Sequence, residues 1–176
     1  RYSNTSAHSL RIAGELVARL RGRGLSAEVV GEVPADADAV VFLGGLREVA
    51  DVDSAVWVNK EAFRAAKAVA GKLSTEGGAF VTVQDTGGDF GLSGPAGGWL
   101  GGLPGLGKTA MQEWPKAGLR AIDLERAGRS AGEVADVLAA ELLAGGHEVE
   151  VALRASGERL TLESFREEAV AAPSIV

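Results

Sequence analysis

The stretch Ala79-Phe-Val-Thr-Val83 decides the fold, because it is an unbroken run of apolar and β-branched residues followed at once by Gln-Asp-Thr-Gly-Gly. A continuous run of this length is typical of a strand buried on both faces of a parallel sheet. The stretch Ala39-Val-Val-Phe-Leu43 repeats the pattern earlier in the chain, and Leu119-Arg-Ala-Ile-Asp-Leu124 predicts a further strand after it. The intervals between these runs are long enough for a helix each.

Apolar residues at helical spacing fill these intervals. Ile12, Leu16 and Leu20 predict one helix, and the next is expected to turn Phe63 and Leu73 towards the core. Ser130 followed three residues later by Glu133 is a capping-box pattern, in which each side chain bonds the backbone N–H of the other residue. The helices are predicted over residues 9–23, 59–73, 103–114 and 130–144.

Alternating helices and strands predict an α/β fold of truncated, Rossmann-like type, with a mainly parallel sheet flanked by helices. Segments 148–155 and 159–162 flank Ser156-Gly157-Glu158 and predict a C-terminal β-hairpin. Residues 27–30 predict a short additional strand. We expect one domain over residues 1–164, and a tail or linker over 165–176 that leads towards a following subdomain.

The composition excludes several classes of protein. The formal net charge is −6 and the pI is near 5.0, which argues against nucleic-acid binding because phosphate recognition relies on clustered lysine and arginine. The absence of cysteine removes disulfides and thiolate metal sites and fits a cytoplasmic protein. No apolar run approaches the ~20 residues of a membrane span. The chain begins with arginine and enters a helical pattern at once, which suggests a piece of a longer protein.

The segment from Gly102 to Thr109 matches the P-loop pattern G-x-x-x-x-G-K-[ST] letter for letter, with Lys108 as its lysine. A phosphate-binding loop needs a strand that runs directly into the glycines, and here the preceding residues are themselves glycine-rich loop. A helix that buries Leu106 and Trp114 on one side accounts for the same residues without a bound phosphate. We expect that packing helix, with a P-loop nucleotide-binding domain as the alternative.

A dinucleotide fingerprint would place G-x-G-x-x-G before the first helix, and residues 3–9 contain no glycine. The pair Gly44-Gly45 follows a predicted strand where a related protein would keep a loop near a cofactor ribose, but a simple glycine turn explains it. The only tyrosine is Tyr2. A first strand ahead of the first helix is not visible; it is either degenerate or lies upstream.

Asp85 and Asp89 follow the strand at 79–83, at the edge where α/β proteins bind ligands. Paired carboxylates bind divalent metals or act as acid and base, so a small-ligand or metal-binding domain is a second alternative. Asp/Gly-rich turns are the favoured explanation of these residues, and neither His8 nor His147 has a nearby partner in the sequence. Trp99, in a glycine-rich loop, indicates an anchor to a core or a partner, with packing as the default.

Three segments together resemble the ketoreductases of modular polyketide synthases and polyunsaturated fatty acid synthases, and specifically their structural subdomain. They are residues 78–92, residues 101–115 and the strand 119–124; the final hairpin fits as well. The most specific part is Glu113-Trp114-Pro115 followed by Ile122-Asp123-Leu124. The resemblance covers roughly residues 10–163.

The resemblance implies a non-catalytic, short-chain-dehydrogenase-like subdomain that supports a catalytic subdomain following it in the chain. That partner would bind NADPH and reduce a β-ketoacyl group on an acyl carrier protein, so the parent protein is expected to be an enzyme within a multienzyme synthase. Short-chain dehydrogenase chemistry needs a tyrosine four residues before a lysine. Pro104 occupies that position relative to Lys108. We therefore expect no catalytic, cofactor or metal residues in this chain.

Overall fold

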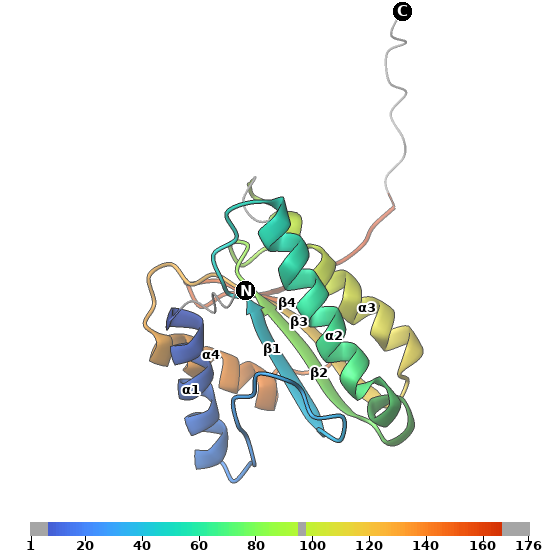
Figure 1. The fold of residues 1–176 in the computed structure, drawn as a ribbon. Helices are drawn as coiled ribbons and strands as arrows, with labels where there is room; N and C mark the ends of the chain where they lie inside the picture. The colour runs from blue at the N-terminus through green and yellow to red at the C-terminus, as the bar shows by residue number, and fades with distance from the viewer. Residues whose placement is uncertain (1–6, 95–97, 167–176) are drawn as a thin grey trace, which may run out of the picture.

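The computed structural model describes residues 7–94 and 98–166, which form a layered α/β fold with a central sheet (Figure 1). No helix within these ranges is both long and apolar enough to cross a membrane. In chain order the elements are α1 (Ala7–Gly22), β1 (Ala39–Gly45), α2 (Val52–Glu76), β2 (Gly78–Gln84), the short 3₁₀ helix η1 (Gly98–Leu100), α3 (Gly102–Glu113), β3 (Ala117–Leu124), α4 (Ala131–Ala144), β4 (Glu150–Leu153) and β5 (Arg159–Thr161).

The strands lie in the order β1-β2-β3-β4-β5, so each strand pairs with the next one along the chain. The first four are parallel, and β5 runs antiparallel to β4. The predicted α/β class, the mainly parallel sheet and the C-terminal hairpin are confirmed. The pairing of β1 with β2 is regular from Ala39 to Phe42 and then shifts before Gly45 pairs with Gln84.

The two faces of the sheet are covered by different helix pairs, as Figure 1 shows. Successive strand residues point to opposite faces. Val81 and Val83 accordingly pack in a core with α1 and α4, whereas Phe80 packs with α2 and α3. The ring of Trp114 meets the Phe80 ring edge-on at 6.1 Å between centroids, which closes the second core at the end of α3.

The connection through α4 has the opposite hand to the two connections before it. All four strands are parallel and added in one direction, yet α2 and α3 lie on one face while α4 lies on the other (Figure 1). Crossovers between parallel strands almost always share one hand, so this reversal is unusual. Because of this reversal, α4 packs beside α1, and helices cover both faces of the sheet.

The helix ends show which parts of the sequence prediction were right. The capping box of α4 is confirmed: the N–H of Glu133 donates to Ser130 Oγ at 3.3 Å, and the N–H of Ser130 donates to Glu133 Oε2 at 2.8 Å. The predicted start of the second helix is wrong, because α2 begins at Val52 behind an Asp51 cap. Phe63, expected to face the core, is 59% exposed because Ala62 beside it takes the buried position.

Two further predictions need correction. Residues 27–30 form no strand, because Val29 and Val30 are exposed and β1 pairs only with β2 among the described residues. The first helix, predicted to begin at residue 9, begins earlier, at Ala7, so that Ser9 lies within α1. The predicted tail at 165–176 falls almost wholly outside the described residues, as does Tyr2.

The short strand β5 is tied to α4 by a buried carboxylate. Glu141 is 5% exposed and pairs with Arg120 and Arg159, each at 2.9 Å. A buried charge is tolerable only when it is paired and hydrogen-bonded, and both conditions are met here. The hydrogen bond from Arg159 to Glu141 raises the pKa of Arg159. The same contact holds the hairpin against the end of α4.

Candidate functional site

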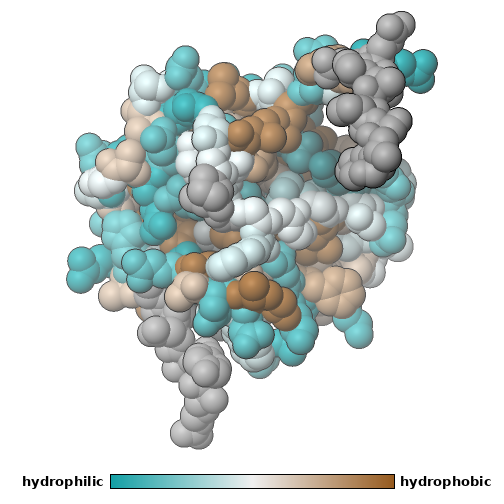
Figure 2. Space-filling view, turned by 90° about the horizontal axis from the view of Figure 1, so that it is seen from above, coloured by the Kyte–Doolittle hydropathy of each residue, from teal (hydrophilic) through white to brown (hydrophobic). Residues whose placement is uncertain are grey.

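The carboxyl ends of the parallel strands are the natural place to look for a site in an α/β fold. Here that edge carries the turn after β1, the long loop from β2 to α3, the loop from β3 to α4 and the end of β4. Figure 2 looks down on this end and shows a band of pale residues of intermediate hydropathy, bordered by separate apolar patches. A ligand can bind at this edge only where the side chains leave room for it.

Asp123, near the end of β3, is fully buried and organises the loop after β2. One carboxylate oxygen accepts from the Thr86 N–H at 2.7 Å. The other accepts from Thr86 Oγ1 at 2.8 Å and from the N–H groups of Asp89 and Phe90 at 2.9 and 2.6 Å. This loop therefore folds down over the ends of β2 and β3. Sequence reasoning missed Asp123 as a site residue, although an acid inside a buried strand is itself a signal.

Asp89 lies in the same loop and belongs to a second polar cluster. Its carboxylate accepts from the Gly91 N–H at 3.0 Å and pairs with Arg154, at the end of β4, at 3.0 Å. The hydroxyl of Ser93, the Gly91 N–H and the Arg154 guanidinium hold the pKa of Asp89 below its ordinary value of 3.8, against the opposing effect of burial. The residue is thus anchored as an anion.

The lowered pKa of Asp89 predicts a specific pH dependence of stability. A group whose pKa is lower in the folded state stabilises the fold above its unfolded pKa, and loses that contribution as the pH falls through the folded value. We therefore expect Asp89→Asn to be less stable than wild type at neutral pH, and the difference to shrink progressively below pH 3.8. Urea unfolding of both proteins across this range measures it. A difference that stays constant in acid would contradict the assignment.

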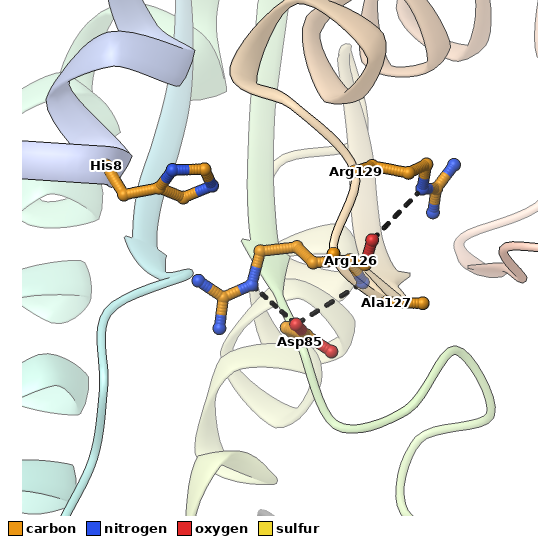
Figure 3. A pocket seen from close by; sticks show the side chains of 6 residues that line it. His8, Asp85, Arg126, Ala127 and Arg129 are labelled. Atoms are coloured by element: carbon orange, nitrogen blue, oxygen red, sulfur yellow. Dashed lines mark hydrogen bonds and ion pairs between the residues drawn. The ribbon is translucent and has the colours of Figure 1, made fainter.

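Asp85 faces a shallow, open hollow of about 380 Å³ formed by α1, the end of β2 and the β3–α4 loop. Its carboxylate pairs with Arg126 Nε at 2.5 Å, and Arg126 Nη1 also donates to the Leu46 carbonyl at 2.9 Å. Figure 3 shows Asp85 and Arg126 pointing at one another across the hollow, while Arg129 turns back to bond the main chain of Arg126. The charged side chains around this hollow are thus mostly bonded to one another or to the main chain.

The two histidines lie at opposite ends of the molecule. His8, at the start of α1, lines the hollow beside Asp85, and no dashed interaction joins it to the other side chains drawn in Figure 3. His147 is exposed between α4 and β4, at the end where the strands begin. The structure therefore brings His8 near Asp85 but does not bring the two histidines together.

Gly44 and Gly45 belong to the strand end rather than to an open loop. A Cβ on Gly45 would lie 2.6 Å from both Leu103 Cδ1 and the Val83 carbonyl oxygen. These distances are closer than real Cβ contacts. The backbone at this point is thus packed against β2 and α3. The predicted glycine turn after the strand is wrong, because both glycines lie within β1.

The residues that match the P-loop pattern lie in α3, as expected if this segment is a packing helix. Gly102 to Thr109 form the first turns of this helix, with Leu103 buried against α2. Lys108 pairs with Glu150 of β4 at 3.1 Å, and the Thr109 hydroxyl bonds back to the Gly105 carbonyl at 3.0 Å. A phosphate-cradling loop needs non-helical backbone at these glycines, so the P-loop alternative is wrong.

The strand order bears on where a cofactor would bind. In doubly wound folds the binding crevice opens where the strand order reverses. The order of the five strands in the described sheet follows the chain from one edge to the other without a reversal. Within the described ranges no group of three or more histidine, aspartate or glutamate side chains is placed to hold a metal ion. Asp85 and Asp89 are each matched by an arginine, which suits cross-linking of loops.

The tryptophans divide into one buried and two exposed residues. Trp114 is 6% exposed, whereas Trp57 and Trp99 are 40% and 53% exposed. The prediction that Trp99 packs into the core is therefore wrong. Contact with a partner is the interpretation of this residue that remains. The Arg64 guanidinium lies 5.4 Å from the centroid of the Trp57 ring, a cation–π arrangement at the surface.

The fold of this chain is similar to part of a solved multidomain structure. A solved structure described as "Adenylation, ketoreductase, and pseudo Asub multidomain structure of a keto acid-selecting NRPS module" superposes with a TM-score of 0.57 at 20% sequence identity. The match covers 84% of this chain and 12% of that chain. At this identity the likeness concerns the fold, and this chain corresponds in size to a small part of a larger multidomain protein.

Searches by sequence gave no further assignment. No protein-family model matches the chain. No curated protein matches it either.

Proposed function

We propose that this chain is the structural, non-catalytic subdomain of a ketoreductase in a modular synthase. Its partner would be a catalytic subdomain that binds NADPH and reduces a β-ketoacyl group carried on an acyl carrier protein. The likeness to a ketoreductase-containing NRPS module supports this proposal. So does the sequence resemblance at Glu113-Trp114-Pro115 and Ile122-Asp123-Leu124.

The observation that carries the proposal is the cross-linking of the loops at the carboxyl edge of the sheet. Asp123 holds the loop after β2 across the strand ends, and Arg154 and Arg126 neutralise Asp89 and Asp85 at that edge. The edge that would bind a ligand in a catalytic relative is therefore used here to tie loops together. Such an arrangement gives a rigid body suited to support a neighbouring domain.

The chemistry of short-chain dehydrogenases also has no place on α3. In those enzymes a lysine steadies a tyrosine that donates a proton to the carbonyl oxygen. Lys108 has Pro104 one turn earlier, and its ammonium group is engaged by Glu150. Hydride and proton transfer would thus belong to the partner subdomain.

The test is a binding and reconstitution experiment. Isothermal titration of the purified chain with NADPH is expected to give no saturable heat, while a complete ketoreductase serves as the positive control. Reduction of a β-ketoacyl thioester is expected only when the chain is combined with the catalytic subdomain. Saturable NADPH binding by this chain alone, or turnover without a partner, would overturn the proposal.

A further inference from the structure

The C-terminal strand β5 forms one edge of the sheet, and one row of its backbone groups is unpaired. It comes last in the strand order, and within residues 7–94 and 98–166 only β4 lies beside it. All of its residues are exposed. An open strand edge of this kind is a template for pairing with a further strand.

The hairpin determines which backbone groups of β5 point away from β4. The Arg154 N–H donates to the Glu158 carbonyl at 2.9 Å, so these two residues form a hydrogen-bonded pair. In an antiparallel ladder such pairs alternate with pairs whose N–H and C=O groups point outward. Arg159 and Thr161, opposite Leu153 and Val151, belong to the outward-pointing set. The free backbone groups of this edge are therefore those of the odd-numbered residues.

The side chains of this segment make the edge complementary to itself. Successive side chains of an extended strand point to opposite faces, so Leu160 and Leu162 share one face. They are 38% and 40% exposed. Arg159, Thr161 and the exposed Glu163 share the other face. The same short segment thus carries an apolar pair on one face and two opposite charges on the other.

The charges select one register for the pairing of two copies. About a two-fold axis perpendicular to the sheet, the residue at the axis lies opposite itself. An axis at Thr161 places Arg159 of one copy opposite Glu163 of the other, and it places Leu160 opposite Leu162. An axis at Leu160 or at Leu162 would put Arg159 opposite an uncharged residue. Cross-strand pairs of opposite charge and of apolar residues stabilise a sheet, which favours the axis at Thr161.

A hollow of about 520 Å³ lies beside β5 on the side of α4. Arg159 lines it, so it lies on the face that Glu163 of a second copy would enter. Glu141 and Glu148 hold the Arg159 guanidinium in place through Nε and Nη2, at 2.9 and 3.0 Å. Among the described residues no group accepts a hydrogen bond from Arg159 Nη1, which leaves this nitrogen for a further carboxylate. The cation is therefore positioned before a partner arrives.

We propose that β5 pairs antiparallel with β5 of a second copy of this chain, about a two-fold axis at Thr161. The two sheets then join into one continuous sheet. The leucines of both copies form the apolar contact on one face, and two Arg159–Glu163 pairs fix the register on the other. The inference goes beyond the proposed function and does not depend on it, because it needs only the residues of this edge.

Disulfide cross-linking tests the register, because the chain contains no cysteine of its own. Opposed residues of a hydrogen-bonded pair have Cα atoms about 5.5 Å apart, which a disulfide can span. Thr161→Cys is therefore expected to give a covalent dimer under mild oxidation. Leu160→Cys and Leu162→Cys are the matched controls, since each lies diagonal to its own copy at about 7–8 Å and should not cross-link. Equal cross-linking of all three variants in non-reducing electrophoresis would overturn the register.

Sedimentation of the unmodified chain tests the edge itself. A dimer that dissociates on dilution is expected for wild type, and Thr161→Pro should abolish it because proline lacks the N–H that bonds across the axis. Thr161→Val is the matched control. It also loses the hydroxyl bond to the Glu150 carbonyl but keeps the N–H, so it should still dimerise. A chain that stays monomeric at every attainable concentration would overturn the second copy as the occupant, as would a dimer that Thr161→Pro leaves intact.

The charge pairs give a third measurement. Glu163→Arg should weaken dimerisation by about tenfold, because each attractive pair across the axis becomes a repulsive one. Glu28→Arg makes the same change of net charge at an exposed position outside β5 and should leave the dimer unchanged. Equal dimer affinities of the two variants would contradict the Arg159–Glu163 pairing. None of these outcomes bears on the proposed function, whose test is NADPH binding and reconstitution.

Discussion

The Asp123→Ala variant is expected to lose about 4 kcal/mol of unfolding free energy, which corresponds to a melting temperature lower by about 10 °C. The substitution removes a buried carboxylate and leaves the N–H groups of Thr86, Asp89 and Phe90 without their acceptor. Each buried donor that loses its partner costs about 1–3 kcal/mol. Thermal and urea unfolding of the purified chain measure the effect.

Two controls separate this role of Asp123 from a general effect of removing an acid. Asp123→Asn can keep its oxygen on the side that accepts three hydrogen bonds, so its loss should be clearly smaller than that of alanine. Asp136→Ala removes an exposed carboxylate that pairs with Arg19, and should change stability little. Similar unfolding curves for Asp123→Ala and Asp136→Ala would show that Asp123 does not hold the loop after β2 in place.

The Gly78→Ala variant is expected to be destabilised by about 3 kcal/mol or more. Gly78 begins β2 with φ +132°, a conformation that L side chains rarely adopt. A Cβ there would also collide with the Asp38 carbonyl oxygen and lie 2.5 Å from Leu73 Cδ2. Because the Asp38 carbonyl also accepts the Ala79 N–H, the backbone cannot move away without losing that bond.

Gly118 offers a matched control on the neighbouring strand. It pairs with Ala79 in the sheet, and a Cβ at this position would meet only the Gly78 carbonyl oxygen at an ordinary 3.7 Å. Gly118→Ala should therefore leave stability unchanged or raise it slightly, because alanine has less backbone freedom to lose in a strand. Equal destabilisation of the two variants in urea unfolding would contradict the steric explanation.

Much of the fold could be predicted because its local patterns agree with the final packing. The buried strands β1, β2 and β3 read as apolar runs, and Ser130 with Glu133 marked the start of α4. The errors arose where tertiary context overrides the local pattern. Val29 and Val30 have strand-forming side chains but no strand beside them among the described residues, and Phe63 stays exposed because Ala62 takes the buried position on α2.

The candidate site could be predicted less well. The sequence placed Asp85 and Asp89 at the correct edge of the sheet, because both follow a buried strand. Their partners Arg126 and Arg154 lie 41 and 65 residues away, and no local pattern connects such distant positions. The role of Asp123 depends on three backbone N–H groups of another loop, which only the folded chain brings together.

The sequential strand order has a consequence for how the chain folds. Each strand from β2 to β5 pairs with the strand synthesised just before it, so no strand has to be inserted between two that are already paired. Each step pairs strands that are neighbours along the chain, and pairing of segments close in sequence favours rapid folding. The sheet can therefore grow from β1 in the order in which the residues leave the ribosome, and be complete before any domain that follows is made.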